Sequence, residues 1–332
     1  MNDVQKITDQ IVTHDLTKVY RTFQKEAGFK GSIQSLIRRQ TVEKTAIRKF
    51  DLSIDKGEFV GLIGPNGAGK TTLIKMLTGI IHPTEGEVTV FGFTPYQLKD
   101  DFKKNFAVVM GQKSQLWWDL PAEDSFLLNK ALYGIPDPEY RQSLGFFSEL
   151  LGISGLVKIP VRNLSLGERM KMELVLALLH NPRVLFLDEP TIGMDAVAQK
   201  QIRQFLKEIN EAKGVTIILT SHYMEDIKHL CKRTIVVRNG IKIYDGDLAA
   251  LLDKYRNYRI ISISFETAAD LNIEMPVEWL EKGPYKAVFK VPKEEAKAVL
   301  YHIMANQEVE DIRIEDEDLG GVVEKIYTAE VR

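Results

Sequence analysis

The chain has 332 residues, of which 44% are hydrophobic and 27% charged, which is enough for one large or two ordinary folded domains. The 44 Lys and Arg residues nearly balance the 46 Asp and Glu residues, so the overall charge gives no sign of a nucleic-acid-binding protein, and we expect no nucleic-acid partner. A single cysteine, Cys231, excludes an internal disulfide, and the absence of a signal-like segment or a long apolar run predicts a cytosolic protein that reaches a membrane only through a partner.

The first motif in the chain is a glycine-rich loop between a strand pattern that begins at Phe59 and a helix pattern. It reads GPNGAGKTT and matches G-x-x-x-x-G-K-[ST], in which backbone N–H groups and the helix N-terminus surround phosphate oxygens. Lys70 is expected to reach the β- and γ-phosphates of a nucleotide, and the Thr71 hydroxyl to bind Mg²⁺. The other predicted contacts of this loop are Gly64, Asn66, Gly67, Gly69 and Thr72. A glycine-rich turn that binds nothing is the alternative.

A long helix pattern begins after a polar turn at Ser165. Glu168 follows three residues later, which is the spacing of a capping box, where each side chain accepts a hydrogen bond from the other residue's backbone. By itself, the turn needs no role other than starting this helix.

Two further apolar runs end in polar residues: VLFLDEP (Val184–Pro190) and TIILTSH (Thr216–His222). Such runs, separated by helix patterns, are typical of strands buried in a parallel sheet, and ligands bind at the carboxyl ends of these strands. Asp188 is therefore expected to hold Mg²⁺, Glu189 to polarise the water that attacks the γ-phosphate, and His222 to contact that phosphate. An α/β fold is predicted up to about residue 247.

The pattern changes after that point. RIISISFE (Arg259–Glu266) and YKAVFKV (Tyr285–Val291) alternate apolar and polar residues, and a helical stretch follows over Lys293–Asn306. We predict a small α+β domain over residues 248–332, in an order that suits a ferredoxin-like regulatory domain. The acidic stretch Glu308–Gly320 is expected at an exposed sheet edge rather than in a ligand site.

The order of the motifs resembles that of the ATP-binding subunits of ABC transporters: the P-loop, then Leu-Ser-Leu-Gly-Glu at Leu164–Glu168, then LFLDEP, then TSH. The resemblance covers about residues 13–247. It implies that residues 1–247 form a P-loop ABC ATPase domain, with a mixed or parallel sheet core and a helical subdomain at about residues 113–180, that hydrolyses ATP with Mg²⁺. It also implies a head-to-tail dimer with an identical or paralogous subunit, in which Ser165 and Gly167 approach the γ-phosphate held by the other subunit. The capping turn would then serve both purposes with one helix N-terminus.

The resemblance implies roles for further residues. Tyr20 resembles the aromatic residue that stacks on adenine, with an ordinary exposed tyrosine as the alternative. Gln112 resembles the glutamine that ligates Mg²⁺ and senses the γ-phosphate, and Asp195 resembles the acidic residue that crosses the dimer interface. The segment after Gln112 would lie where a membrane partner docks, and at least one of Trp117 and Trp118 is expected to be exposed, because adjacent residues rarely face the same way.

Three features depart from the family pattern. Leu166 and Glu168 stand where the family usually has glycine and glutamine, so Leu166 places a side chain where glycine would let the backbone approach the phosphate closely. The third departure is an insertion at about residues 24–46, which overlaps the basic stretch Gly28–Lys49. A predicted helical face there is formed by Ile33, Leu36 and Ile37. Such a helix suits an anionic membrane surface or an acidic partner, and a solvated helix folded over the domain is the alternative.

The turn Leu164–Glu168 resembles the ABC signature, and we call it the signature turn. The segment that contains it, Asn163–Asp195, together with the segment Val108–Phe126, the insertion and the short C-terminal domain, resembles ABC-2 type exporter ATPases, of the group that includes proposed drug or viologen exporters. This resemblance implies integral membrane permease subunits as partners and a location at the cytoplasmic face of the membrane. An importer ATPase is one alternative. A soluble ABC ATPase outside transport is another, although the chain has one P-loop rather than two cassettes and no sustained heptads between P-loop and signature.

Overall fold

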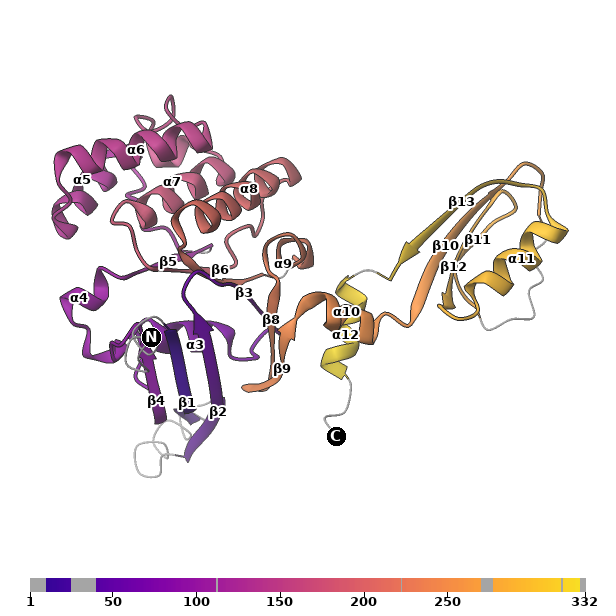
Figure 1. The fold of residues 1–332 in the computed structure, drawn as a ribbon, viewed down its shortest axis with the longest axis horizontal. Coiled ribbons are helices and arrows are strands. Elements are labelled where there is room, and N and C mark those ends of the chain that lie inside the picture. The colour runs from indigo at the N-terminus through magenta and orange to yellow at the C-terminus, as the bar shows by residue number, and fades with distance from the viewer. Residues whose placement is uncertain are drawn as a thin grey trace, which may run out of the picture. The chain divides into compact units, whose positions relative to one another are not determined.

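The computed structural model describes residues 10–24, 40–111, 113–221, 223–269, 277–317 and 319–328. The chain divides into two compact units, Met1–Gly246 and Asp247–Arg332 (Figure 1). Within the described residues, no helix is long and apolar enough to cross a membrane.

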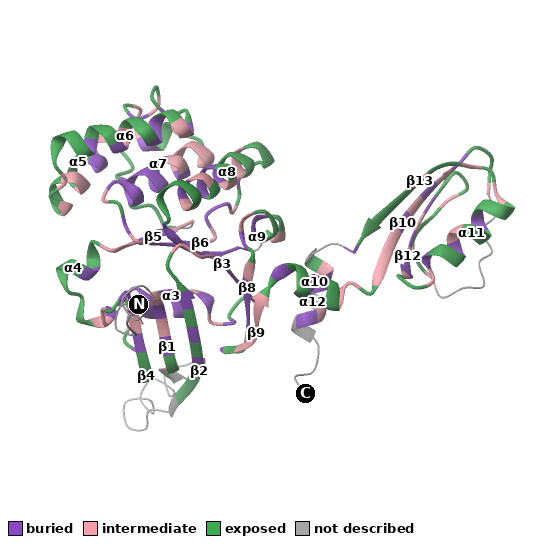
Figure 2. Ribbon diagram, in the orientation of Figure 1, coloured by how far each residue is buried: buried purple, intermediate pink, exposed green. Residues whose placement is uncertain are grey.

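The described part of the first unit contains a six-stranded sheet with the order β5-β6-β7-β3-β8-β9. The neighbours from β5 to β8 are parallel. The strands are β5 (Phe106–Met110), β6 (Val184–Asp188), β7 (Thr216–Thr220), β3 (Phe59–Ile63), β8 (Arg233–Arg238) and β9 (Ile241–Asp247). Buried residues dominate β3, β6 and β7, as their apolar runs without alternation predict (Figure 2).

A three-stranded antiparallel sheet with the order β2-β1-β4 packs near the first helix after the P-loop. Its strands are β1 (Gln10–Gln24), β2 (Gln40–Asp55) and β4 (Glu85–Val90), and the helix is α3 (Lys70–Leu77). One hydrophobic core joins Ile11, Phe50 and Val88 of this sheet to Leu73 of α3 and Phe186 of β6. Because α3 contacts both sheets through this core, its N-terminus has a fixed position at the P-loop.

The other helices in the described part of the first unit lie between its strands along the chain. They are the short helices η1 (Pro95–Gln97), α4 (Asp100–Lys103) and η2 (Val161–Asn163), and the longer α5 (Ala122–Tyr133), α6 (Asp137–Leu151), α7 (Leu166–Leu178), α8 (Ala196–Lys213) and α9 (Met224–Leu230). The helices α5, α6 and α7 lie together (Figure 1), where the predicted helical subdomain was expected.

The second unit is an α+β structure. Its antiparallel sheet has the order β11-β12-β10-β13 in the described residues, and α11 connects β12 to β13 while β10 lies between those two strands. The elements are α10 (Leu248–Tyr255), β10 (Tyr258–Phe265), β11 (Glu278–Lys282), β12 (Lys286–Pro292), α11 (Ala296–Asn306), β13 (Val309–Asp316) and α12 (Leu319–Thr328). This is a split βαβ arrangement, which a ferredoxin-like domain contains, although the ferredoxin-like assignment itself stays a prediction.

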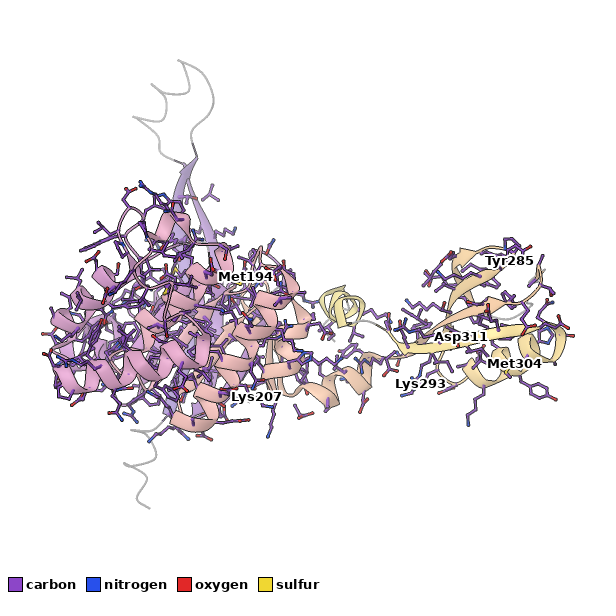
Figure 3. All side chains as sticks on the ribbon, turned by 90° about the horizontal axis from the view of Figure 1, so that it is seen from above. Met194, Lys207, Tyr285, Lys293, Met304 and Asp311 are labelled. Atoms are coloured by element: carbon purple, nitrogen blue, oxygen red, sulfur yellow. The ribbon has the colours of Figure 1, made fainter. Side chains whose placement is uncertain are left out.

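One face of this second sheet packs on α11. Ile261 and Phe289 of the sheet and Val299 of the helix belong to one buried cluster. Tyr285 and Met304, which Figure 3 labels, lie outside the cluster and are each 60% exposed. The acidic strand β13 lies at the edge of the sheet, as predicted.

The fold class is confirmed, and the basic insertion needs one correction. The residues expected on its apolar helical face lie outside the described residues. From Gln40 onward, however, the chain is strand β2, so Lys44 lies on a strand and not on a helix. Pairing with β1 along most of its length gives this segment backbone hydrogen bonds that its helical spacing could not reveal.

Candidate nucleotide-binding site

Three parallel strands bring the predicted site residues to one edge of the central sheet. β6, β7 and β3 are consecutive neighbours. Because parallel strands end at a common edge, the P-loop after β3, Asp188 at the end of β6 and Ser221 after β7 are neighbours. His222 and Gln112 lie outside the described residues, so their contacts stay predictions.

The P-loop is held by backbone contacts that only glycine permits. Gly69 precedes α3 with φ of 112°, and a Cβ at this position would lie 2.5 Å from the Ala46 carbonyl oxygen. A Cβ at Gly64 would lie 2.3 Å from the Val237 carbonyl oxygen. Larger side chains are therefore excluded at both positions. No side chain caps α3, so its first N–H groups can serve phosphate oxygens.

Lys70 holds its ammonium group against the loop. Nζ donates hydrogen bonds to the carbonyl oxygens of Gly64 at 2.7 Å and Pro65 at 3.2 Å, and the residue is only 6% exposed. Burial lowers the pKa of Lys70, while the carboxylates of Glu189 and Asp188 act in the opposite direction. The structure thus keeps a buried cation where the motif predicts contact with the β- and γ-phosphates.

Asp188 connects the start of α3 to the end of β7. Its Oδ2 accepts a hydrogen bond from Thr71 Oγ1 at 3.0 Å, and its Oδ1 accepts one from Thr220 Oγ1 at 2.7 Å. A hydroxyl and a carboxylate side by side are hard oxygen donors of the kind that Mg²⁺ prefers when it also binds nucleotide phosphates. The residues present therefore fit the predicted Mg²⁺ site.

Glu189 has an unusual backbone conformation at the predicted base position. Its φ is 55°, in the left-handed region, and its N–H donates to the carbonyl oxygen of Thr220 at 3.0 Å and to its Oγ1 at 3.1 Å. A Cβ at Gly111 would lie 2.1 Å from the Glu189 carbonyl oxygen, so glycine is required beside it. Strain of this kind costs about 1–3 kcal/mol and is kept where the surroundings fix the residue.

A pocket of about 230 Å³ lies over the P-loop. Its lining consists of Tyr20, Lys44, Ala46, residues 66–72 and Glu189. Tyr20 comes from β1 and lines this pocket together with the phosphate loop, and its stacking on adenine stays a prediction. Lys44 pairs with Tyr20 in the β1–β2 register and is a lining residue that our sequence analysis missed. A larger hollow of about 610 Å³ near Lys207 contains none of the predicted site residues.

Ser165 and Glu168 form the predicted capping box at the start of α7. Ser165 Oγ accepts from the Glu168 N–H at 3.3 Å, and Glu168 Oε2 accepts from the Ser165 N–H at 2.8 Å. These bonds lower the pKa of Glu168 below its ordinary value. Ser165 and Gly167 are absent from the described lining of the P-loop pocket, so their contact with a nucleotide in another subunit stays a prediction.

Asp195 is the N-cap residue of α8. Its Oδ1 accepts hydrogen bonds from the N–H groups of Val197 and Ala198, both at 2.9 Å. A Cβ at Gly167 would lie 2.8 Å from the Ala198 Cβ, so the signature turn and the start of α8 touch within one chain. Asp195 thus has a capping role, and its predicted role at a dimer interface is a separate proposal.

Comparison with known proteins decides the family. Residues 47–192 match the family model described as ABC transporter. The chain is 32% identical over 212 residues to the ABC transporter ATP-binding protein NatA of Bacillus subtilis, in an alignment that covers 64% of this chain and 86% of that protein. The chain belongs to the ABC transporter ATP-binding proteins. The predicted enzyme class is confirmed with it: an ABC ATP-binding protein binds and hydrolyses ATP.

Other relatives include both exporters and importers among the ABC proteins. The Nod factor export ATP-binding protein I of Burkholderia thailandensis is 32% identical, covering 70% of this chain and 76% of that protein. The methionine import ATP-binding protein MetN 2 of Enterococcus faecalis is 28% identical, covering 80% of each chain. Residues 257–315 match the model for the C-terminal domain of EvrA-like ABC transporters.

A solved structure supports the ABC ATPase fold. It is the dimeric, post-hydrolysis state of the ATP-binding cassette MJ0796 bound to ADP and Pi, with 25% identity and a TM-score of 0.58. The match covers 72% of this chain and 98% of that chain.

One buried carboxylate close to the nucleotide-binding site, that of Asp226, was not indicated by the sequence. Asp226 on α9 is 0% exposed and accepts hydrogen bonds from Thr191 Oγ1 at 2.5 Å, Ser221 Oγ at 2.8 Å and Arg203 NH1 at 2.8 Å. Thr191 lies two residues after Glu189, and Ser221 lies at the end of β7. One carboxylate therefore connects the turn after β6, the end of β7 and helix α8. In the sequence, Asp226 has no feature that separates it from a solvated helix residue.

Proposed function

We propose that this ABC ATP-binding protein is the ATPase subunit of an ABC-2 type exporter, held at the cytoplasmic face of the membrane by integral membrane permease subunits. The resemblance of the signature segment and the Nod factor export relative support export. Import is the second candidate, because the MetN 2 relative aligns over a larger share of the chain.

The observation that carries the ATPase role is the convergence of Tyr20, the P-loop and Glu189 on one pocket. Tyr20 stacks on the adenine, and Lys70 with the N–H groups at the start of α3 binds the β- and γ-phosphates. Glu189 accepts the proton of the attacking water, and His222 contacts the γ-phosphate.

The proposed site also includes oxygen ligands for a metal ion beside the phosphates. Thr71, Asp188 and Gln112 would hold Mg²⁺, which supplies positive charge against the charge that develops on the phosphates. The hydroxyls of Thr71 and Thr220 donate hydrogen bonds to the Asp188 carboxylate, which supports this proposal by holding the carboxylate beside the phosphate loop.

Two ATPase subunits close head to tail around two ATP molecules in this proposal. The N-terminus of α7 presents Ser165 and Gly167, with its positive dipole end, to the γ-phosphate held by the other subunit. Asp195 lies at the exposed start of α8, where a partner can reach it. Closure and opening of this dimer drive the permease.

A groove beside β5 and α5 is the proposed docking surface for the permease. It has a volume of about 400 Å³, and its lining includes Val108, Met110 and Tyr133. Asn129 Oδ1 and His180 Nδ1 are also at this groove and are buried without a hydrogen-bond partner in the described part of the chain. A helix with an apolar face and hydrogen-bond donors fits this surface. Trp117 and Trp118, which are 47% and 53% exposed, come shortly after the groove residues Ser114 and Gln115 in the sequence.

Native purification from detergent-solubilised cells tests the transport role. We expect multi-span membrane proteins to co-elute with this chain, and a Trp117→Ala, Trp118→Ala variant to retain less of them. Substitution of the exposed Tyr301 by Ala is the matched control. Co-elution of ribosomal or chromosomal proteins instead would contradict transport and leave the ATPase site intact. ATP-dependent uptake into inside-out membrane vesicles, measured with the partner's substrate, would then separate export from import.

A further inference from the structure

A buried carboxylate on helix α7 accepts hydrogen bonds from Ser114 and Gln115, which form one wall of the docking groove. Glu173 is 3% exposed, and its Oε1 accepts hydrogen bonds from Ser114 Oγ at 2.5 Å and from the Gln115 N–H at 3.0 Å. Its Oε2 lies 3.2 Å from the same backbone nitrogen. Ser114 and Gln115 both line the groove, so the carboxylate lies directly behind the surface where a permease helix would bind.

A second contact joins the same face of α7 to the same segment. Arg169, four residues before Glu173, places its guanidinium 5.8 Å from the centre of the Trp118 ring. Residues four apart lie on one side of a helix, so residues 114–118 follow a single face of α7. The Trp118 carbonyl oxygen also accepts a hydrogen bond from the Arg162 N–H at 2.9 Å, just before the signature turn.

Glu173 is a charged residue in a buried position, where an apolar side chain would be enough if packing were its only role. Burial raises the pKa of this carboxyl, and the hydrogen bonds from Ser114 and from the backbone at Gln115 and Leu116 oppose the shift. A carboxylate can be buried at low cost when hydrogen-bond donors surround it, and the donors to Glu173 come from residues 114–116. Removing the carboxylate would leave the Gln115 N–H without its acceptor, whereas Ser114 Oγ would keep the Leu116 carbonyl oxygen at 3.3 Å.

We propose that Glu173 is a positioning residue that fixes the wall of the docking groove to α7, so that the wall and the Ser165 turn move as one body. The helix between them is continuous over Leu166–Leu178, and an unbroken helix transmits a displacement along its length. A permease helix that shifts residues 114–118 therefore shifts the Ser165 turn, and closure of the ATPase dimer shifts the groove wall. This inference rests on the head-to-tail dimer of the proposed function.

Hydrogen exchange on the full-length chain tests the connection. The parent carries Glu189→Gln to keep ATP bound, and Glu173→Ala and Glu173→Leu, which both lack the acceptor, are compared in this background. Lys171→Met is the matched control, because Lys171 Nζ bonds the Leu151 carbonyl oxygen at 3.1 Å and so connects α7 to α6 instead of the groove. Without ATP, we expect the Gln115 amide to exchange about tenfold faster in Glu173→Ala than in the parent, since its acceptor is gone. Glu173→Leu leaves a smaller cavity and serves if Glu173→Ala does not fold.

The ATP response separates positioning from simple structural support. In the parent and in Lys171→Met, ATP should slow exchange both at the signature turn, residues 164–168, and at residues 114–118. In the Glu173 variants the signature turn should still respond, with unchanged ATP affinity, while residues 114–118 respond less. A full response of residues 114–118 in both Glu173 variants would overturn the inference and assign the response to the adjacent Gln112. Dimerisation of the parent on ATP without any response at residues 114–118 would overturn it as well. Failure of the parent to dimerise would instead contradict the proposed function, and the inference with it.

Discussion

Lys70 is the residue on which phosphate binding depends most directly. Replacing Lys70 by Ala removes a buried cation and its bonds to the loop carbonyls, so we expect ATP binding and phosphate release to fall below detection. Lys75→Ala on the same helix is the control, because Lys75 does not line the pocket. Titration with a fluorescent ATP analogue and a phosphate-release assay measure both quantities. Normal turnover in Lys70→Ala would contradict the P-loop assignment.

Tyr20 should affect affinity for the base rather than for the phosphates. Base–aromatic stacking contributes about 1–3 kcal/mol, so Tyr20→Ala should weaken ATP binding about 5- to 150-fold, whereas Tyr20→Phe should retain most of the affinity. Binding of inorganic triphosphate, which has no base, should be the same in all three proteins. Equal loss of triphosphate and ATP binding in Tyr20→Ala would show that Tyr20 supports the β1–β2 pair and does not stack on the base.

The start of α7 should depend on pH through Glu168. The capping box lowers the pKa of Glu168, whose ordinary value is 4.5. A depressed acid pKa in the folded state adds stability above the unfolded value, and this stability is lost as the pH falls below about 4.5 and through the folded value. The difference in urea-unfolding free energy between the parent and Glu168→Gln should therefore be larger at pH 7 than at pH 3. The same difference at both pH values would contradict an ionic capping role, and Glu149→Gln on α6 serves as control.

Elements with local signals were predictable, and elements defined by distant partners were not. The P-loop, the capping box and the three strands leading to the site depend on residues within one short segment, so sequence patterns found them. Strand β2 was partly assigned to a helix, because its hydrogen bonds go to β1 and its own spacing does not show them. The roles of Lys44, Glu173 and Asp226 depend on the same kind of long-range contact.

The molecule consists of two units, and the described lining of the P-loop pocket comes entirely from the first. A chain that ends at Gly246 should therefore bind ATP with an affinity close to that of the full chain, measured with the same fluorescent analogue. Any change in phosphate release would then be assigned to residues 247–332, in keeping with the predicted regulatory role. Loss of ATP binding by a truncated chain that is folded by circular dichroism would contradict the assignment of the site to the first unit.

In the proposed assembly, two chains close around ATP, and Glu189 is needed to open them by hydrolysis. The decisive measurement is light scattering of the Glu189→Gln chain during size-exclusion chromatography, with ATP and Mg²⁺ or with ADP and Mg²⁺. We expect a stable dimer with ATP only, together with little phosphate release. A chain that stays monomeric with ATP would contradict the head-to-tail dimer, and an unchanged rate of hydrolysis would remove Glu189 from the role of base.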